Sequence, residues 1–169
     1  MKSHRRIFCT SNISYRRFCS SVNDEEVKKF SKLGKRWWDP SSNSGAGPLH
    51  DLNPIRIQFI SEELRDIGNK HDVFESKLLL GLSILDVGCG GGLLSESLSR
   101  LGARVTGIDP SKENIAVARL HADRDRITKT IDYKNTTIEE LSNTDRKFDV
   151  ICAFAVPLSN FLYPLKFTV

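Results

Sequence analysis

A glycine-rich turn between an apolar run and a helical segment constrains the fold of this chain more than any other feature. Residues 82–87 read LSILDV, an aliphatic stretch typical of a buried strand, and residues 88–92 read GCGGG. Residues 93–101, LLSESLSRL, follow with the apolar spacing of a helix. Because glycine has no Cβ, such a turn lets backbone amides approach a ligand closely. The pattern predicts a strand–turn–helix unit with a ligand site at the carboxyl end of the strand.

The alternation of strand and helix continues along the chain. Further strands are expected at 103–108, 131–135 and 148–154, and helices are expected after Ser111 and Thr137. Helices between successive strands predict a parallel, doubly wound sheet with right-handed crossovers. We therefore expect an α/β fold of the Rossmann-like type.

Two acidic residues accompany the glycines. Asp86 precedes the turn, and Asp109 closes the next strand, 21 residues after Gly88, where a carboxylate can accept hydrogen bonds from the ribose hydroxyls of an adenosine. The dinucleotide fingerprint G-x-G-x-x-G needs its third glycine where this chain has Leu93. The D-x-G-x-G-x-G form instead resembles the first motif of class I methyltransferases that use S-adenosylmethionine (SAM). The sequence favours SAM, and a nicotinamide oxidoreductase stays open as an alternative.

Residues 23–80 predict an N-terminal helical extension. Apolar residues recur at three- and four-residue steps between 24 and 38, which predicts a single helix that ends in a pair of tryptophans. The tryptophans either belong to the core or a lid, or contact a substrate lipid. A second helix is expected to begin at Asn53, as its cap, with Pro54 at the first helical position.

The charge is unevenly distributed. The net charge is +4, yet residues 1–22 carry five Lys and Arg and no acid, so the remaining 20 basic residues face 21 acidic ones. A nearly neutral body is a poor electrostatic footprint for nucleic acid, and we expect no nucleic-acid partner. The Arg- and Ser-rich segment predicts a mitochondrial transit peptide, with an uncleaved basic tail as the alternative. No apolar run approaches the roughly 20 residues of a membrane span, so any membrane contact is expected to be peripheral.

Five stretches of sequence resemble one family, the ubiquinone biosynthesis O-methyltransferases, in a likeness that runs from about residue 24 to 154. They are FSKLGKRWW at 30–38, PLH at 48–50, NPIR at 53–56, ILDVGCGGGLLSE at 84–96 and ARLHA at 118–122. The resemblance implies methyl transfer from SAM to a ring hydroxyl of a polyprenylated catechol or hydroquinone. It also implies peripheral attachment to the matrix face of the inner mitochondrial membrane, within a coenzyme Q biosynthetic complex.

The resemblance also implies the cofactor-binding residues, which are Arg56, Gly88, Gly90, Asp109 and Phe154. Arg56 would pair with the methionine carboxylate, and Phe154 would line the adenine side. Judged without the family, Arg56 reads as a solvated charge on a helix. His50 and His121 have no partner pattern and are expected in the core or on the surface.

The chain departs from the family after the fourth strand. Family members continue with a Glu-x-x-Glu-His segment associated with a divalent metal, expected to be Mg²⁺, whereas residues 155–169 read AVPLSNFLYPLKFTV and contain no acid. We therefore expect a truncated chain with about four of the seven strands of a complete sheet, without metal ligands or a catalytic base. A non-catalytic SAM-binding partner of a coenzyme Q assembly is the alternative. The predicted organisation is a transit peptide at 1–22, helices at 23–80, the SAM-binding half-domain at 81–154 and an apolar tail at 155–169.

Overall fold

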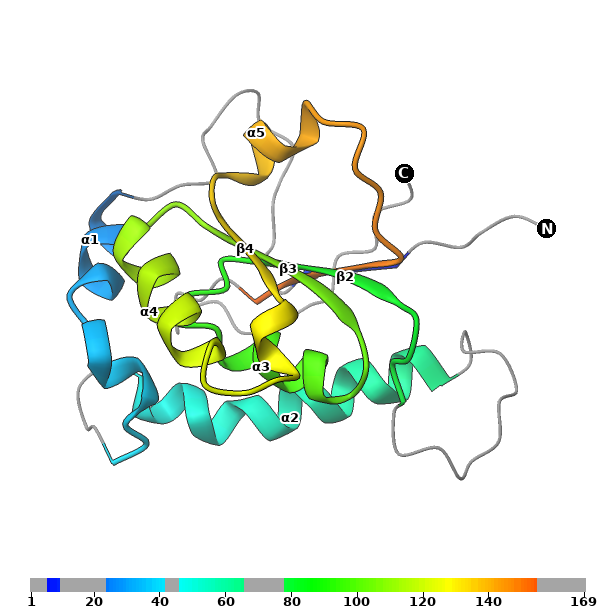
Figure 1. The fold of residues 1–169 in the computed structure, drawn as a ribbon, viewed down its shortest axis with the longest axis horizontal. Helices are drawn as coiled ribbons and strands as arrows, with labels where there is room; N and C mark the ends of the chain where they lie inside the picture. Colours follow the sequence, from blue (N-terminus) through cyan, green and yellow to red (C-terminus); the bar gives the residue numbers. More distant parts are fainter. Residues whose placement is uncertain (1–5, 10–23, 42–45, 66–77, 155–169) are drawn as a thin grey trace.

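A parallel β-sheet forms the centre of the computed structural model, which describes residues 6–9, 24–41, 46–65 and 78–154 (Figure 1). The strand order is β1-β5-β2-β3-β4, and every neighbouring pair is parallel. The strands are β1 (Arg6–Cys9), β2 (Ser83–Val87), β3 (Arg104–Asp109), β4 (Asp132–Asn135) and β5 (Val150–Ala153). The helices are α1 (Asp24–Ser31), η1 (Gly34–Trp38), α2 (Gly47–Arg65), α3 (Leu93–Arg100), α4 (Lys112–Ala122), η2 (Thr128–Thr130) and α5 (Ile138–Ser142).

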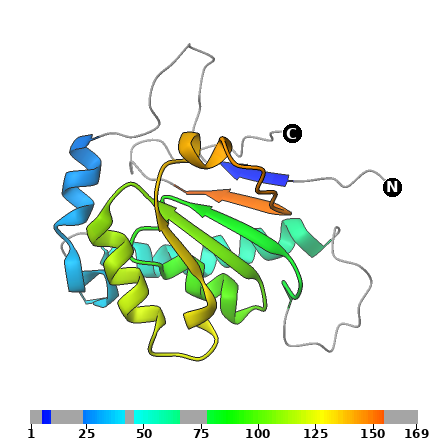
Figure 2. The ribbon, with the colours of Figure 1, turned by 45° about the horizontal axis from the view of Figure 1, so that its top comes forward.

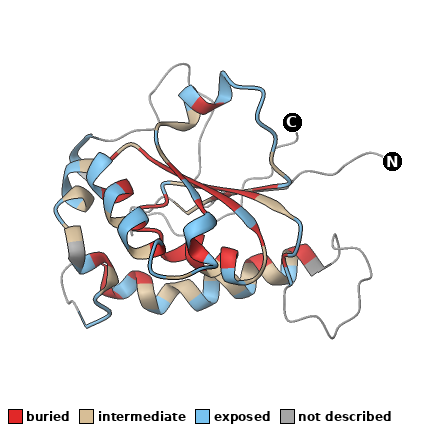
Figure 3. Ribbon diagram, viewed as in Figure 1, coloured by how far each residue is buried: buried red, intermediate tan, exposed pale blue. Residues whose placement is uncertain are grey.

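Helices cover both faces of the sheet, as a parallel sheet requires. Figure 2 shows α2 and α3 on one side and the short α5 on the other. The larger core joins Ile60 of α2 and Leu98 of α3 to Ile84 of β2, and a smaller core packs Leu141 of α5 on Leu85. Ile84 and Leu85 are adjacent in β2 and therefore point to opposite faces of the sheet, and both side chains are buried. Figure 3 shows that buried residues run along the central strands and the helix faces that pack on them.

The predicted Rossmann-like unit is confirmed. The four strands expected from the sequence form β2 to β5, and the helices between them follow in the predicted order. Ser111 caps α4 by accepting a hydrogen bond from the Asn114 backbone N–H at 3.1 Å. Thr137 and Glu140 form a capping box at the start of α5.

The N-terminal helices differ from the prediction in two places: where the first helix ends and where the second begins. The single helix expected at 24–38 is two elements, α1 and η1, because Gly34 has a positive φ of 49°, which an α-helix does not allow. The second helix begins at Gly47 rather than at Asn53. Pro48 occupies its first turn, where a missing N–H costs no hydrogen bond, and Pro54 lies inside the helix.

Part of the predicted transit peptide belongs to the sheet, which has five strands instead of four. Residues 6–9 read RIFC, and as β1 they pair with β5, with Ile7 opposite Ile151. The physical reason is that a short apolar run satisfies the backbone groups along the open edge of β5. The rest of residues 1–22 and the whole tail 155–169 lie outside the described residues. Within the described ranges, no helix has the length and apolar character to cross a bilayer.

Candidate functional site

The glycine turn lies at the carboxyl edge of the sheet, where β2, β3 and β5 end side by side. Strand register places Val87 beside Ile108 on one side and beside Ala153 on the other. The amides of Gly88 and Cys89 both donate to the Ile108 carbonyl, at 2.8 and 3.0 Å. The turn is thus tied to β3, which ends one residue later in an acid.

Asp109 holds the glycine turn through hydrogen bonds to its two carboxylate oxygens. Its Oδ2 accepts the Gly90 N–H at 2.9 Å, and its Oδ1 accepts the Ser111 N–H at 2.8 Å and the Asn114 Nδ2 at 3.2 Å. The residue is 7% exposed, and this burial raises the pKa of the carboxyl against the lowering effect of the backbone hydrogen bonds. A carboxylate offers about four acceptor positions, so one position remains on Oδ2 beside the turn.

Trp37 of η1 lies directly on the turn. A Cβ added to Gly90 would stand 2.3 Å from Trp37 Cη2, and one added to Gly91 would stand 2.5 Å from Trp37 Cγ. The indole is 5% exposed, so Trp37 belongs to the core, as the first of the two interpretations held. Glycine at positions 90 and 91 therefore makes room for an indole ring, a requirement that the sequence reasoning missed.

Replacing Gly91 with alanine tests this requirement. Gly91 has no positive φ, so the added methyl group acts only through its collision with Trp37, and overpacking of this kind costs about 1–3 kcal/mol. We expect Gly91→Ala to lower the free energy of unfolding in urea by that amount. In a Trp37→Ala background the same change should cost less, because the ring is gone. Equal costs in the two backgrounds would contradict the packing argument.

Tyr133 of β4 packs on the turn from another direction. A Cβ at Gly92 would stand 2.4 Å from the Tyr133 hydroxyl oxygen, and one at Gly107 would stand 2.7 Å from its Cδ1. Gly92 also has a φ of 91°, which favours glycine independently of space. The turn is thus held between an aromatic side chain from the N-terminal extension and one from the sheet.

Asp86 is buried beneath the same turn. It is 2% exposed, and its Oδ2 accepts the Ser95 hydroxyl at 2.6 Å. Burial raises the pKa of Asp86 to about 6, while the Ser95 hydrogen bond and the charge of Arg56 act in the opposite direction. Asp86 therefore serves the internal structure of the turn, with Ser95 as its partner at the start of α3.

Arg56 of α2 reaches the same edge and stacks on Phe154, with its Cζ 5.5 Å from the ring centroid. Among the described residues, its buried Nε has no hydrogen-bond partner. Burial lowers the pKa of the guanidinium, and the nearby Asp86 raises it. A buried cationic donor without a partner fits an anionic group of a ligand better than it fits a solvated helix charge. The contact also places Phe154 at the same end of the site as Arg56.

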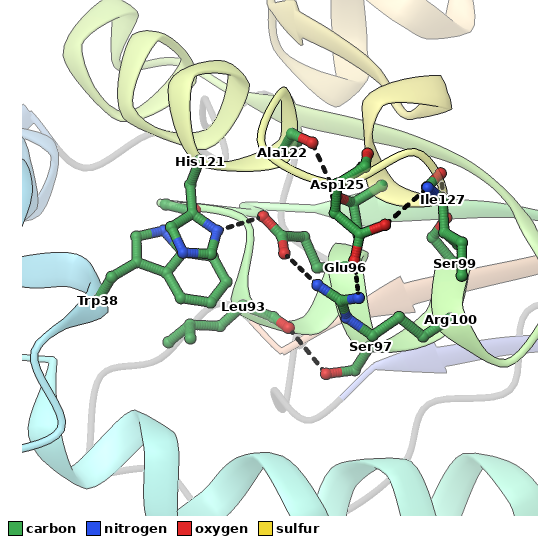
Figure 4. Close-up of polar contacts among 12 residues, drawn as sticks. Trp38, Leu93, Glu96, Ser97, Ser99, Arg100, His121, Ala122, Asp125 and Ile127 are labelled. Carbon is green, nitrogen blue, oxygen red and sulfur yellow. Dashed lines mark hydrogen bonds and ion pairs between the residues drawn. The ribbon is translucent and has the colours of Figure 1, made fainter.

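His50 and His121 both contact the tryptophan pair, and Figure 4 shows the stacking of His121 on Trp38. His121 lies parallel to Trp38, with ring centroids 3.4 Å apart, and its Nδ1 is 2.7 Å from Glu96 Oε1. His50 Nε2 is 2.9 Å from the Trp37 carbonyl oxygen. Trp38 in turn donates from Nε1 to the Gly91 carbonyl at 3.0 Å. No sequence signal pointed to these contacts, because they join residues far apart in the chain.

All five predicted cofactor residues thus lie at one edge of the sheet, in two groups. Gly88, Gly90 and Asp109 form the first group, at the end of β3. Arg56 and Phe154 form the second, and the charge of Asp86 acts on Arg56. In the described part of the chain, no three His, Cys, Asp or Glu side chains are placed to share a metal ion.

Comparison with known proteins relates this arrangement to methyltransferases. A family model described as a methyltransferase domain matches residues 84–164. The chain is 45% identical over 137 residues to the Ubiquinone biosynthesis O-methyltransferase, mitochondrial, of Arabidopsis thaliana, covering 81% of this chain and 42% of that protein. It is 44% identical over 138 residues to the Ubiquinone biosynthesis O-methyltransferase of Azorhizobium caulinodans, covering 81% of this chain and 52% of that protein. The chain therefore spans about half the length of these curated relatives.

A solved structure supports the fold. Magnesium protoporphyrin IX methyltransferase from Synechocystis PCC 6803, solved with bound SAM, aligns with a TM-score of 0.54 at 22% identity. The alignment covers 82% of this chain and 65% of that one. The chain is thus similar in sequence to ubiquinone biosynthesis O-methyltransferases over 81% of its length, its residues 84–164 match a methyltransferase domain, and it shares its fold with this solved structure.

Proposed function

We propose that this chain binds SAM at the carboxyl edge of the sheet and supplies the cofactor half of an O-methyltransferase of ubiquinone biosynthesis. One observation carries the SAM site: the buried carboxylate of Asp109 holds the glycine turn through the Gly90 amide and keeps one acceptor position free beside it. The names of the relatives support the reaction and the pathway. The acceptor in this proposal is a ring hydroxyl of a polyprenylated catechol or hydroquinone.

Each residue of the site has a role in this proposal. The Asp109 carboxylate accepts a ribose hydroxyl, the turn around Gly88 and Gly90 lies against the ligand, and Arg56 pairs with the methionine carboxylate. Phe154 stacks on Arg56, which supports a place near the methionine end of the ligand, whereas the resemblance implies the adenine side. When bound, SAM supplies an electrophilic sulfonium methyl group, and the protein's contribution is to hold that group in line with the acceptor oxygen.

The cellular setting belongs to the same proposal. The relative from Arabidopsis thaliana is named as mitochondrial, and the acid-free segment at 1–22 has the composition of an import signal. We place the protein on the matrix face of the inner membrane, in contact with a coenzyme Q biosynthetic complex. A divalent metal, Mg²⁺ by resemblance, would need a set of ligands that the described residues do not bring together, so no step of the proposed reaction is assigned to it. A non-catalytic SAM-binding partner is the second candidate, favoured by the acid-free sequence at 155–169.

Calorimetry with three ligands tests the cofactor assignment. S-adenosylhomocysteine should bind, 5′-methylthioadenosine should bind more weakly because it lacks the carboxylate that Arg56 holds, and NADH should give no heat. In an Arg56→Gln variant, the affinity for S-adenosylhomocysteine should fall about tenfold or more, and the affinity for methylthioadenosine should stay near that of the unchanged chain. Binding of NADH alone would overturn the assignment. Methyl transfer to a polyprenylated catechol would separate the enzyme from the silent partner.

A further inference from the structure

We propose that Trp37 and Asn114 are positioning residues that orient the Asp109 carboxylate toward the ribose of the cofactor. The inference rests on the proposed function, because it assumes that the ligand is an adenosyl compound. It assigns a binding role to η1, a short helix that precedes the Rossmann-like unit in the sequence. Neither Trp37 nor Asn114 is among the residues that the family resemblance implies.

The three side chains form a directed chain of hydrogen bonds. Trp37 Nε1 donates to Asn114 Oδ1 at 3.0 Å, and Asn114 Nδ2 donates to Asp109 Oδ1 at 3.2 Å. An indole N–H can only donate, and a carboxylate can only accept. The amide of Asn114 therefore satisfies both neighbours in one orientation only, with its oxygen toward the indole and its nitrogen toward the acid. Trp37 fixes that orientation from outside the sheet.

The same indole also reaches Asp109 by a second route. Its ring lies on Gly90, and the Gly90 N–H donates to Asp109 Oδ2 at 2.9 Å. The contacts close into a ring that runs from Trp37 through Asn114 and Asp109 to Gly90 and back to the indole. Trp37, Asn114 and Asp109 are all buried, so water does not compete with these bonds.

The consequence is that the two carboxylate oxygens have different tasks. Oδ1 already accepts two donors, from Ser111 and Asn114, whereas Oδ2 accepts one, from Gly90. The oxygen left with an acceptor position for a ribose hydroxyl is therefore Oδ2. If the Asn114 donor is lost, Oδ1 regains an open position, the carboxylate can rotate, and the preference for presenting Oδ2 is lost.

Trp38 provides a matched control from the same helix. Like Trp37 it donates a hydrogen bond from Nε1, but its acceptor is the Gly91 carbonyl of the glycine turn instead of the Asn114 side chain. It stacks on His121 and has no hydrogen bond to Asn114 or Asp109. Loss of the Trp38 N–H perturbs the turn but leaves the hydrogen bonds from Trp37 to Asn114 and from Asn114 to Asp109 in place.

The test compares Trp37→Phe with Trp38→Phe, using S-adenosylhomocysteine and its analogue without the two ribose hydroxyls as probes in calorimetry. We expect Trp37→Phe to weaken binding of S-adenosylhomocysteine by about 3- to 10-fold and to leave binding of the analogue nearly unchanged. Trp38→Phe should weaken both ligands by the same factor. Asn114→Leu breaks the chain of bonds at its middle and should reproduce the ribose-dependent loss, so the test does not depend on one variant folding.

Equal losses for both ligands in Trp37→Phe, or no loss, would overturn the inference while leaving the SAM site intact. If the unchanged chain binds neither adenosyl ligand, the proposed function itself fails and the inference falls with it. Thermal unfolding of each variant shows whether a loss of affinity arises from global destabilisation.

Discussion

Asp109→Ala is expected to lower the affinity for S-adenosylhomocysteine by roughly 1.5–3 kcal/mol and to destabilise the fold at the same time. The affinity falls because the carboxylate that accepts the ribose is gone. The fold is weakened because three donors, from Gly90, Ser111 and Asn114, lose their common acceptor in a buried site. Calorimetry and urea unfolding measure the two effects separately.

A matched aspartate lies on the neighbouring strand. Asp132 of β4 has a half-exposed side chain and pairs with Arg146 at 2.9 Å on the surface. Exposed pairs of this kind contribute about 0–1 kcal/mol, so Asp132→Ala should alter stability only slightly and binding not at all. If Asp109→Ala keeps the affinity of the unchanged chain, the ribose is bound elsewhere.

Asp86→Asn is expected to gain about 3 kcal/mol of stability relative to the unchanged chain as the pH rises from about 4 to above 6. The folded-state pKa of Asp86, about 6, lies above its ordinary value of 3.8 because the carboxyl is buried, so ionisation costs the folded state free energy. That cost is absent below about pH 4, grows as the pH rises, and is complete above about pH 6, and a shift of this size corresponds to about 3 kcal/mol. Asparagine keeps an oxygen that can accept the Ser95 hydroxyl and carries no charge.

Urea unfolding of both chains between pH 4 and pH 7.5 measures this effect. The stability of Asp86→Asn relative to the unchanged chain should rise with pH across that range. Several exposed acids have pKa values lowered by hydrogen bonds and act in the opposite direction, but they are present in both chains and cancel in the difference. These acids are Asp39, Glu113, Asp125 and Glu140. If the free energies of unfolding of the two chains change with pH in the same way, the pKa of Asp86 is not raised by burial.

The Rossmann-like unit could be predicted from the sequence because each of its elements carries its own local signal. Apolar residues mark β2, β3 and β5, whereas β4 reads DYKN and has the weakest signal. Ser111 and Thr137 mark helix starts through hydrogen bonds within their own turns. The N-terminal helices were predicted less well. Gly34 and Pro48 decide where these helices break and begin, and an apolar stripe that spans Gly34 hides the interruption.

The candidate site could be predicted only in part, for a related reason. Asp109 and the glycine turn are close in sequence and belong to a recognised pattern, so their meeting at one edge follows from the topology. The contact between Trp37 and Asn114 joins residues 77 positions apart, and nothing in either local sequence specifies it. Such contacts depend on how α1, η1 and α2 pack against the rest of the fold, and this tertiary packing leaves no local pattern in the sequence.

The packing of the Trp37 indole against Gly90 and Gly91 has a consequence for how related sequences should vary. A side chain at position 90 or 91 and a large ring at position 37 exclude each other sterically. Substitutions at these places should therefore be correlated across relatives: where the ring is replaced by a small residue, position 91 is free to carry alanine or serine, while position 90 stays restricted by its φ of 55°. The number of glycines in such a turn then records which neighbour packs against it as much as which ligand it holds.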